Sequence, residues 1–83
     1  MTEDQVKSKI KKFIFAKFPL AQRQQLKDGD PLLESGILDS LGVLDLVEFA
    51  EQEFSVHIAD EELTRENFQN IDCIVNFVCS KNA

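Results

Sequence analysis

The chain has 83 residues, of which 43% are hydrophobic and seven are Phe, and its formal net charge is −6. This length suits one domain over residues 1–83, with a core that needs no metal or disulfide to fold. The negative charge argues against binding to nucleic acid, because nucleic acid phosphates are neutralised by Lys and Arg.

A first helix is predicted to begin at Thr2 and to end near Pro19. Thr2 and Gln5 have the spacing of a capping box, and the residue before a proline resists the helical conformation. One apolar stripe follows at helical spacing: Val6, Ile10, Phe13 and Ile14. Four lysines occupy the other faces: Lys7, Lys9, Lys11 and Lys12. We therefore expect an apolar inner face and a basic outer one.

Residues 19–38 are predicted to be mostly loop. They contain four residues that interrupt regular structure: Pro19, Gly29, Pro31 and Gly36. A loop of this length in a compact domain indicates either function or internal packing. Four apolar side chains could pin it to the core: Leu32, Leu33, Ile37 and Leu38.

A second helix is predicted after Asp39, a favourable N-cap, and runs to about Phe54. Its apolar face comprises Val43, Leu46, Val47, Ala50 and Phe54. The opposite face comprises Leu41, Asp45, Glu48 and Gln52, with Glu51 beside them. Leu41 is thus an apolar residue on an acidic face.

Acidic residues are concentrated in the middle of the chain. Residues 1–27 hold seven Lys or Arg and two acids, whereas residues 28–62 hold eleven acids and no Lys or Arg. A charged block of this kind is usually a solvated face. Its length and single sign also indicate a docking surface for partners that present basic groups.

The last third of the chain predicts two further helices. Asp60, Glu61 and Glu62 suit the first turn of a short third helix. Asn70 suits the cap of a final helix, with an inward face of Ile71, Ile74, Val75 and Val78. The expected fold is all-α: a small four-helix bundle of three main helices and a short third one, with a long loop between helices one and two.

The two cysteines and the one histidine do not form a recognisable metal or disulfide pattern. Cys73 and Cys79 are six residues apart on the predicted final helix and point in different directions, so we expect free thiols in a cytoplasmic protein. His57 stands alone, which leaves no metal-ligand cluster. The sequence shows neither a signal peptide nor an apolar run of membrane-spanning length.

Ser40 is a candidate for a chemical role, because it lies where the second helix is predicted to begin. A nucleophilic serine needs a base and an oxyanion hole, and no G-x-S-x-G elbow surrounds this one. We therefore predict no catalytic residue and no enzyme. Asp39 and Ser40 could simply start the helix. A hydroxyl beside the positive end of a helix is also a favourable place for a phosphate ester.

The stretch ESGILDSLGVLDLVEFAEQEFSVHIADEEL, residues 34–63, resembles the centre of an acyl carrier protein. The Asp39-Ser40-Leu41 triplet matches the modification motif of that family. The resemblance implies that Ser40 receives 4′-phosphopantetheine from coenzyme A, transferred by a phosphopantetheinyl transferase with Mg²⁺. Asp39 would cap the helix and aid recognition. An acidic surface with an apolar centre would be read by partner enzymes: Leu41, Asp45, Glu48 and Glu51.

The resemblance further implies a monomeric carrier domain that holds acyl or aminoacyl groups as thioesters. Its partners would be acyl-loading, synthase or transferase enzymes with basic docking surfaces. Four residues depart from the carriers of fatty-acid synthesis: Gly42, Glu48, His57 and Ala59. Together with the basic first helix, they favour a specialised polyketide or nonribosomal-type pathway. The alternatives are a housekeeping fatty-acid carrier and an unmodified acidic adaptor. Gly42 could allow the phosphopantetheine arm or a partner protein to approach the helix closely, or it could be a tolerated substitution.

Overall fold

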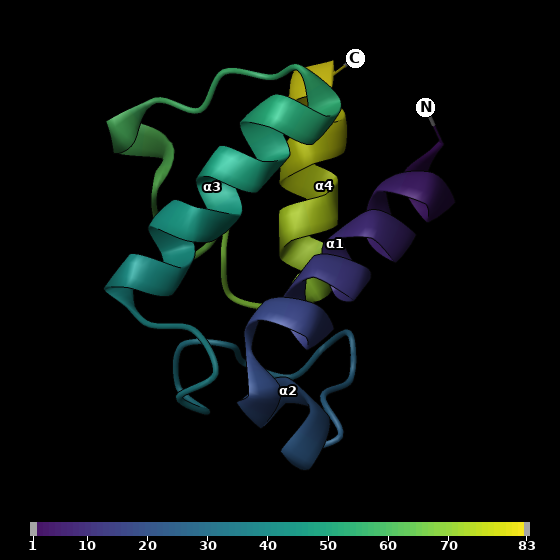
Figure 1. The fold of residues 1–83 in the computed structure, drawn as a ribbon. Helices are drawn as coiled ribbons and strands as arrows, with labels where there is room; N and C mark the ends of the chain where they lie inside the picture. Colours follow the sequence, from purple (N-terminus) through teal and green to yellow (C-terminus); the bar gives the residue numbers. More distant parts are fainter. Residues whose placement is uncertain (1, 83) are drawn as a thin grey trace.

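The computed structural model describes residues 2–82, which contain helices and no strand. The elements in chain order are α1 (Glu3–Lys17), α2 (Pro19–Arg23), α3 (Ser40–Phe54), the 3₁₀ helix η1 (Asp60–Glu62) and α4 (Ile71–Asn82). Helices α1, α3 and α4 surround the core, and α1 packs most extensively against α4 (Figure 1). The predicted all-α fold is confirmed.

Helix α1 begins with the predicted capping box. The Gln5 N–H donates to Oγ1 of Thr2 at 3.2 Å, and the Thr2 N–H donates to Oε1 of Gln5 at 3.1 Å. The helix ends at Lys17, and the backbone of the following Phe18 is extended, as expected before a proline. Of the four residues predicted to face inward, Val6, Ile10 and Ile14 are buried. The fourth, Phe13, is only half-buried.

The loop expected over residues 19–38 is wrong at its start, because Pro19–Arg23 forms α2. Pro19 ends one helix and begins the next, since its fixed φ and missing N–H suit the first helical position. The buried Ala21 docks this turn on the core. The remainder of the segment is loop, and it is pinned largely as predicted: Leu32, Ile37 and Leu38 are buried and Leu33 is half-buried.

Helix α3 begins as predicted, because Oδ1 of Asp39 accepts the Gly42 N–H at 2.7 Å. It ends at Phe54, where Ser55 adopts a left-handed conformation with φ of 54°. Leu46, Val47, Ala50 and Phe54 are buried, and Val43 is half-buried against them.

Helix α4 has the predicted cap and the predicted inner face. Oδ1 of Asn70 accepts the Cys73 N–H at 2.8 Å. All four residues of the inner face are buried: Ile71, Ile74, Val75 and Val78. Cys73 and Cys79 are free, half-buried thiols, and burial raises the pKa of Cys79.

Asp28 connects the long loop to two helices. Its Oδ2 lies 2.6 Å from Nζ of Lys7, and its Oδ1 lies 3.0 Å from Nζ of Lys11. Its carbonyl accepts the Asp72 N–H at 3.2 Å, while the Asp72 carboxylate lies 3.2 Å from Lys7. The ammonium groups of Lys7 and Lys11 hold the pKa of Asp28 below its usual range, and the carboxylates of Asp28 and Asp72 raise the pKa of Lys7.

We predict that Asp28→Asn lowers the free energy of unfolding by about 1 kcal/mol at pH 7, as measured by urea denaturation. Asp28 has a lower pKa in the folded chain than in the unfolded one, so its contribution is complete above the unfolded pKa. That contribution is lost as the pH falls below about 4. The difference from the wild type should therefore shrink at pH 3.

The matched control is Glu66→Gln, which removes one negative charge from an exposed side chain. This control should unfold like the wild type at both pH values. A deficit of Asp28→Asn that stays constant from pH 7 to pH 3 would contradict the assignment.

Candidate functional site

Ser40 is the first residue of α3, and it is exposed. The extended backbone of Asp39 and the bond from its side chain to Gly42 fix where the helix starts. The first N–H groups of a helix lack intrahelical acceptors and carry the positive end of the helix dipole. This position therefore suits a serine that bears a phosphate ester, whose anion the helix end stabilises.

Two leucines on α3 face solvent beside Ser40. Leu41 is 72% exposed and Leu44 is 54% exposed, and these are the exposed large hydrophobic residues of the described chain. Leu41 was predicted on this face, whereas sequence analysis assigned no role to Leu44. The spacing could have indicated that Leu44 lies beside Leu41, because residues three apart are neighbours on a helix surface. The two side chains form an apolar centre next to the serine.

The predicted acidic residues of this face differ in their surroundings. Asp45 and Glu48 are exposed, and Glu48 accepts a 3.5 Å hydrogen bond from Gln52. Glu51 instead turns to the segment after α3, where its Oε2 accepts the Ile58 N–H at 2.9 Å. The side chain of His57 is exposed, and its Nδ1 lies 3.6 Å from the same carboxylate. Asp45 and Glu48 thus lie on the exposed face with Leu41, whereas the carboxylate of Glu51, one turn beyond Glu48, is directed toward the segment after α3.

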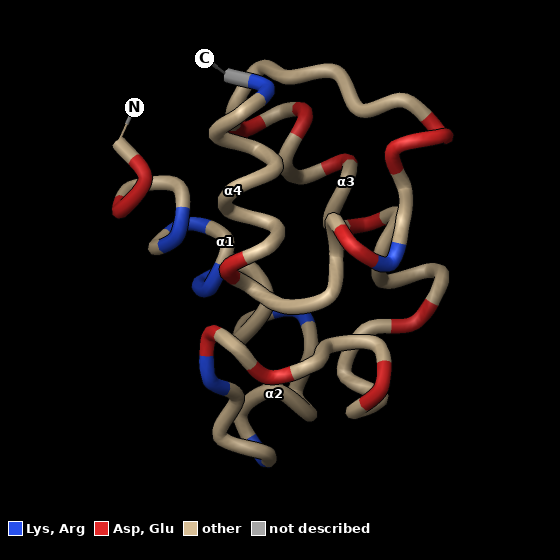
Figure 2. Tube along the Cα trace, turned by 180° about the vertical axis from the view of Figure 1, so that it is seen from behind, with Lys and Arg blue, Asp and Glu red and all other residues tan. Residues whose placement is uncertain are grey.

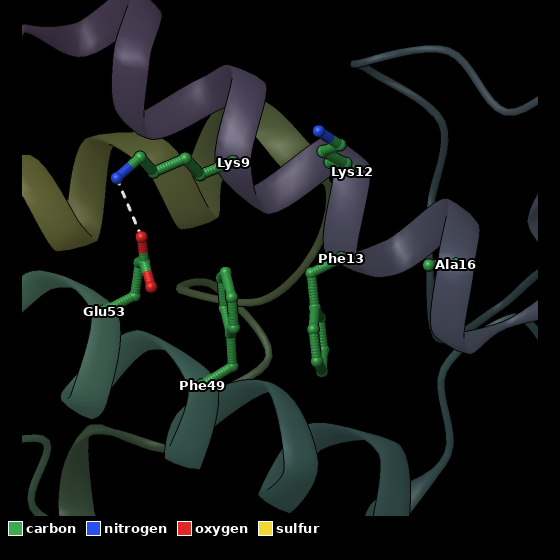
Figure 3. Close-up of a pocket in the computed structure, with 6 residues that line it drawn as sticks. All are labelled: Lys9, Lys12, Phe13, Ala16, Phe49 and Glu53. Atoms are coloured by element: carbon green, nitrogen blue, oxygen red, sulfur yellow. Dashed lines mark hydrogen bonds and ion pairs between the residues drawn. The ribbon is translucent and has the colours of Figure 1, made fainter.

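Helices α1 and α3 meet along a seam of three side-chain pairs, and Figure 3 shows two of them. Lys9 is 2.7 Å from Glu53, and the rings of Phe13 and Phe49 stack with centroids 4.3 Å apart. The third pair, Lys17 and Asp45, lies 3.9 Å apart. The pairs are spaced by four residues on both helices, as antiparallel packing requires. A hollow of about 390 Å³ opens beside the aromatic pair, lined by Lys9, Lys12, Phe13, Ala16, Phe49 and Glu53.

Gly42 is buried where the end of α1 approaches the first turn of α3. A Cβ atom at Gly42 would lie 3.0 Å from Cε1 of Phe18 and 3.1 Å from Cδ1 of Leu38. Neither of the two interpretations of Gly42 made from the sequence included a contact with Phe18 or Leu38. The close approach is made by the chain itself: the Phe18 ring occupies the space that a side chain would need.

No protein-family model matches the chain. An acyl carrier protein of Buchnera aphidicola subsp. Acyrthosiphon pisum (strain 5A) is 31% identical over 77 residues, covering 93% of this chain and 92% of that protein. The probable acyl carrier protein PigG of Serratia sp. (strain ATCC 39006) is 33% identical over 73 residues, covering 88% and 84%. This chain belongs to the acyl carrier protein family. An acyl carrier protein of Chloroherpeton thalassium is 28% identical over 81 residues, covering 98% of both chains.

Acyl carrier proteins are non-catalytic carriers with a phosphopantetheine prosthetic group, and they work with synthase enzymes and a phosphopantetheinyl transferase. This chain is therefore a carrier and not an enzyme. Within residues 2–82, no group of His, Cys, Asp and Glu residues has an arrangement that could hold a metal ion. None of the described helices has the length and apolarity needed to cross a membrane. The exposed hydroxyl at the start of α3 fits the attachment of a phosphate ester.

We predict that Gly42→Ala destabilises this acyl carrier protein, although alanine is the better helix former by about 1 kcal/mol. The new methyl group must displace Phe18 or the buried Leu38. We expect a net loss of about 1 kcal/mol in the free energy of unfolding, measured by urea denaturation.

The double variant Phe18→Leu with Gly42→Ala separates crowding from other causes, because it removes the ring that the methyl group meets. In the Phe18→Leu background, Gly42→Ala should destabilise less than in the wild type, because only the contact with Leu38 remains. A stabilising Gly42→Ala in the wild-type background would show that the contact is loose.

Proposed function

We propose that Ser40 carries 4′-phosphopantetheine and that the chain conveys acyl or aminoacyl groups as thioesters between partner enzymes. The observation that carries the proposal is the exposed Ser40 at the capped start of α3, in a chain of the acyl carrier protein family. The serine has no base of its own because the transferase provides the catalytic groups. Asp39, Ser40 and Leu41 form the attachment motif.

The residues around Ser40 have distinct roles in this proposal. Asp39 caps α3 and thereby holds the first turn in place, and the unpaired N–H groups of that turn offset the negative charge of a phosphodiester. The thiol of the attached arm supplies the thioester chemistry. Because Ser40 is exposed, the transferase and later partners can reach it without unfolding the helix.

Partner enzymes would dock on the outer face of α3. Leu41 and Leu44 give this surface an apolar centre, and Asp45 and Glu48 give it an acidic rim. Glu51 belongs to the same surface in the proposal, although it also binds the Ile58 N–H. An apolar anchor within a charged rim is the usual arrangement of an interaction hot spot. The occupants would be enzymes with basic groups around an apolar pocket, which the acids attract over a distance.

The pathway in the proposal is a specialised polyketide or nonribosomal-type one, in which the chain acts as a cytoplasmic, monomeric carrier domain over residues 1–83. Support comes from the residues in which the chain departs from the housekeeping pattern. Gly42 accommodates Phe18, and the basic residues of α1 pair with acids of α3 and of the long loop. Figure 2 shows Lys and Arg gathered on α1 and around α2.

The attachment is tested by incubating the chain with coenzyme A, Mg²⁺ and a broad-specificity phosphopantetheinyl transferase. Intact-protein mass spectrometry should show one added phosphopantetheinyl group on the wild type and none on Ser40→Ala. Ser55→Ala removes another exposed hydroxyl and should be modified like the wild type. No mass gain, or a gain that survives Ser40→Ala, would refute the proposal and leave the adaptor alternative.

The same reaction tests the docking surface. Charge reversal at Glu48 should slow modification roughly three- to tenfold, because it replaces attraction of a basic partner with repulsion. Charge reversal at Glu66, which is exposed in the segment before α4, changes the net charge equally and should have little effect. An unchanged rate for the Glu48 variant would count against this surface.

The pathway is tested by supplying the phosphopantetheinylated chain to the malonyl transferase of a bacterial fatty-acid synthase. We expect malonyl loading at least about tenfold slower than on a housekeeping carrier, because the rim of α3 presents different contacts. Equal loading rates, read by mass spectrometry, would favour the housekeeping alternative.

A further inference from the structure

Lys17 stands beside the acidic face on which partners are proposed to dock. Its Nζ lies 3.9 Å from Oδ2 of Asp45, and the two side chains are 52% and 48% exposed. The same two residues line a hollow of about 250 Å³ on this face, together with Phe13, Glu48, Phe49 and Gln52. A positive charge therefore lies within the acidic rim itself.

The packing of α1 on α3 holds Lys17 in this place. Phe13, one helical turn earlier, stacks on Phe49, which is one turn beyond Asp45. A further turn along, Lys9 binds Glu53 at 2.7 Å. Phe18, which follows Lys17, lies against Gly42. These contacts hold the end of α1 on both sides of Lys17, so the backbone of Lys17 stays next to α3 and its half-exposed side chain remains within reach of Asp45.

The seam divides the acids of α3 into two groups. Asp45 and Glu53, on the edge next to α1, each face a lysine. Glu48 faces Gln52, a neutral partner, on the exposed side. A basic partner that approaches Asp45 meets a cation already present, whereas Glu48 offers it an uncompensated carboxylate.

We propose that Lys17 is a specificity-determining residue that competes with basic partners for Asp45 and directs their docking toward Leu44 and Glu48. This inference rests on the proposed function. The partner it fits has basic side chains that contact Glu48 around a pocket for Leu41 and Leu44, and no strong cation opposite the α1 edge. Partners that depend on Asp45 are slowed by Lys17 and discriminated against.

The test measures kcat/KM of a broad-specificity phosphopantetheinyl transferase toward variants of the full chain at low salt. Lys17→Gln should raise kcat/KM by about two- to fivefold, because exposed charge pairs of this kind have effects of that size. The gain should disappear at about 1 M salt, where charges are screened within a few ångströms. Circular dichroism and thermal melting establish that each variant is folded.

Two controls make the result specific to the pair. Lys27→Gln changes the net charge equally from an exposed loop position before Asp28, and it should leave kcat/KM within about 1.5-fold of the wild type, as expected for a charge remote from the docking face. In an Asp45→Asn background, Lys17→Gln should give no gain, because the carboxylate that it uncovers is absent.

Equal rates for the wild type and a folded Lys17→Gln would overturn the inference while leaving the attachment to Ser40 intact. An equal gain from Lys27→Gln, or a gain that persists without Asp45, would overturn it too. A wild-type chain that is not modified at all would refute the proposed function and this inference together.

Discussion

The missing side chain at Gly42 is the constraint on which the geometry of the carrier site depends. It allows the Phe18 ring to lie against the first turn of α3, and so determines how closely the end of α1 approaches Ser40. The aromatic pair of Phe13 and Phe49 and the two charge pairs of the seam then follow at intervals of one turn. Protein interiors are close-packed, so a single added methyl group would be felt along this whole contact.

Local signals predicted the starts of the helices well, because each start depends on one or two side chains. Thr2 and Asp39 cap their helices as their residue types suggest. The structure departed from expectation where contacts are distant in sequence. Helix α2 begins at Pro19 and packs its buried Ala21 on the core, and Glu51 turns toward Ile58 across the end of α3. Periodicity along one helix cannot indicate which neighbour lies beside it.

Within the candidate site, too, local features could be predicted from the sequence and contacts between helices could not. The residue type and position of Ser40 favoured a modified serine over a nucleophile, and the attachment remains a prediction; the structure adds that this serine is exposed at the helix start. Leu44 could have been placed beside Leu41 by spacing alone. The contacts of Gly42 and Lys17 could not be inferred from the sequence, because each depends on how α1 lies on α3. Likewise, the acidic block from residue 28 to 62 is only partly an outer surface, since Asp28 binds lysines of α1.

The segment that leads into α3 is anchored to the core of the protein. Ile37 and Leu38, directly before Asp39 and Ser40, are buried, and the Leu32 N–H donates to the Gln69 carbonyl at 2.8 Å. Ser40 therefore emerges from an anchored segment rather than from the tip of a free loop. A partner that meets a preorganised surface loses little conformational entropy on binding. The anchored segment thus lets the carrier dock as a rigid body and leave again without refolding.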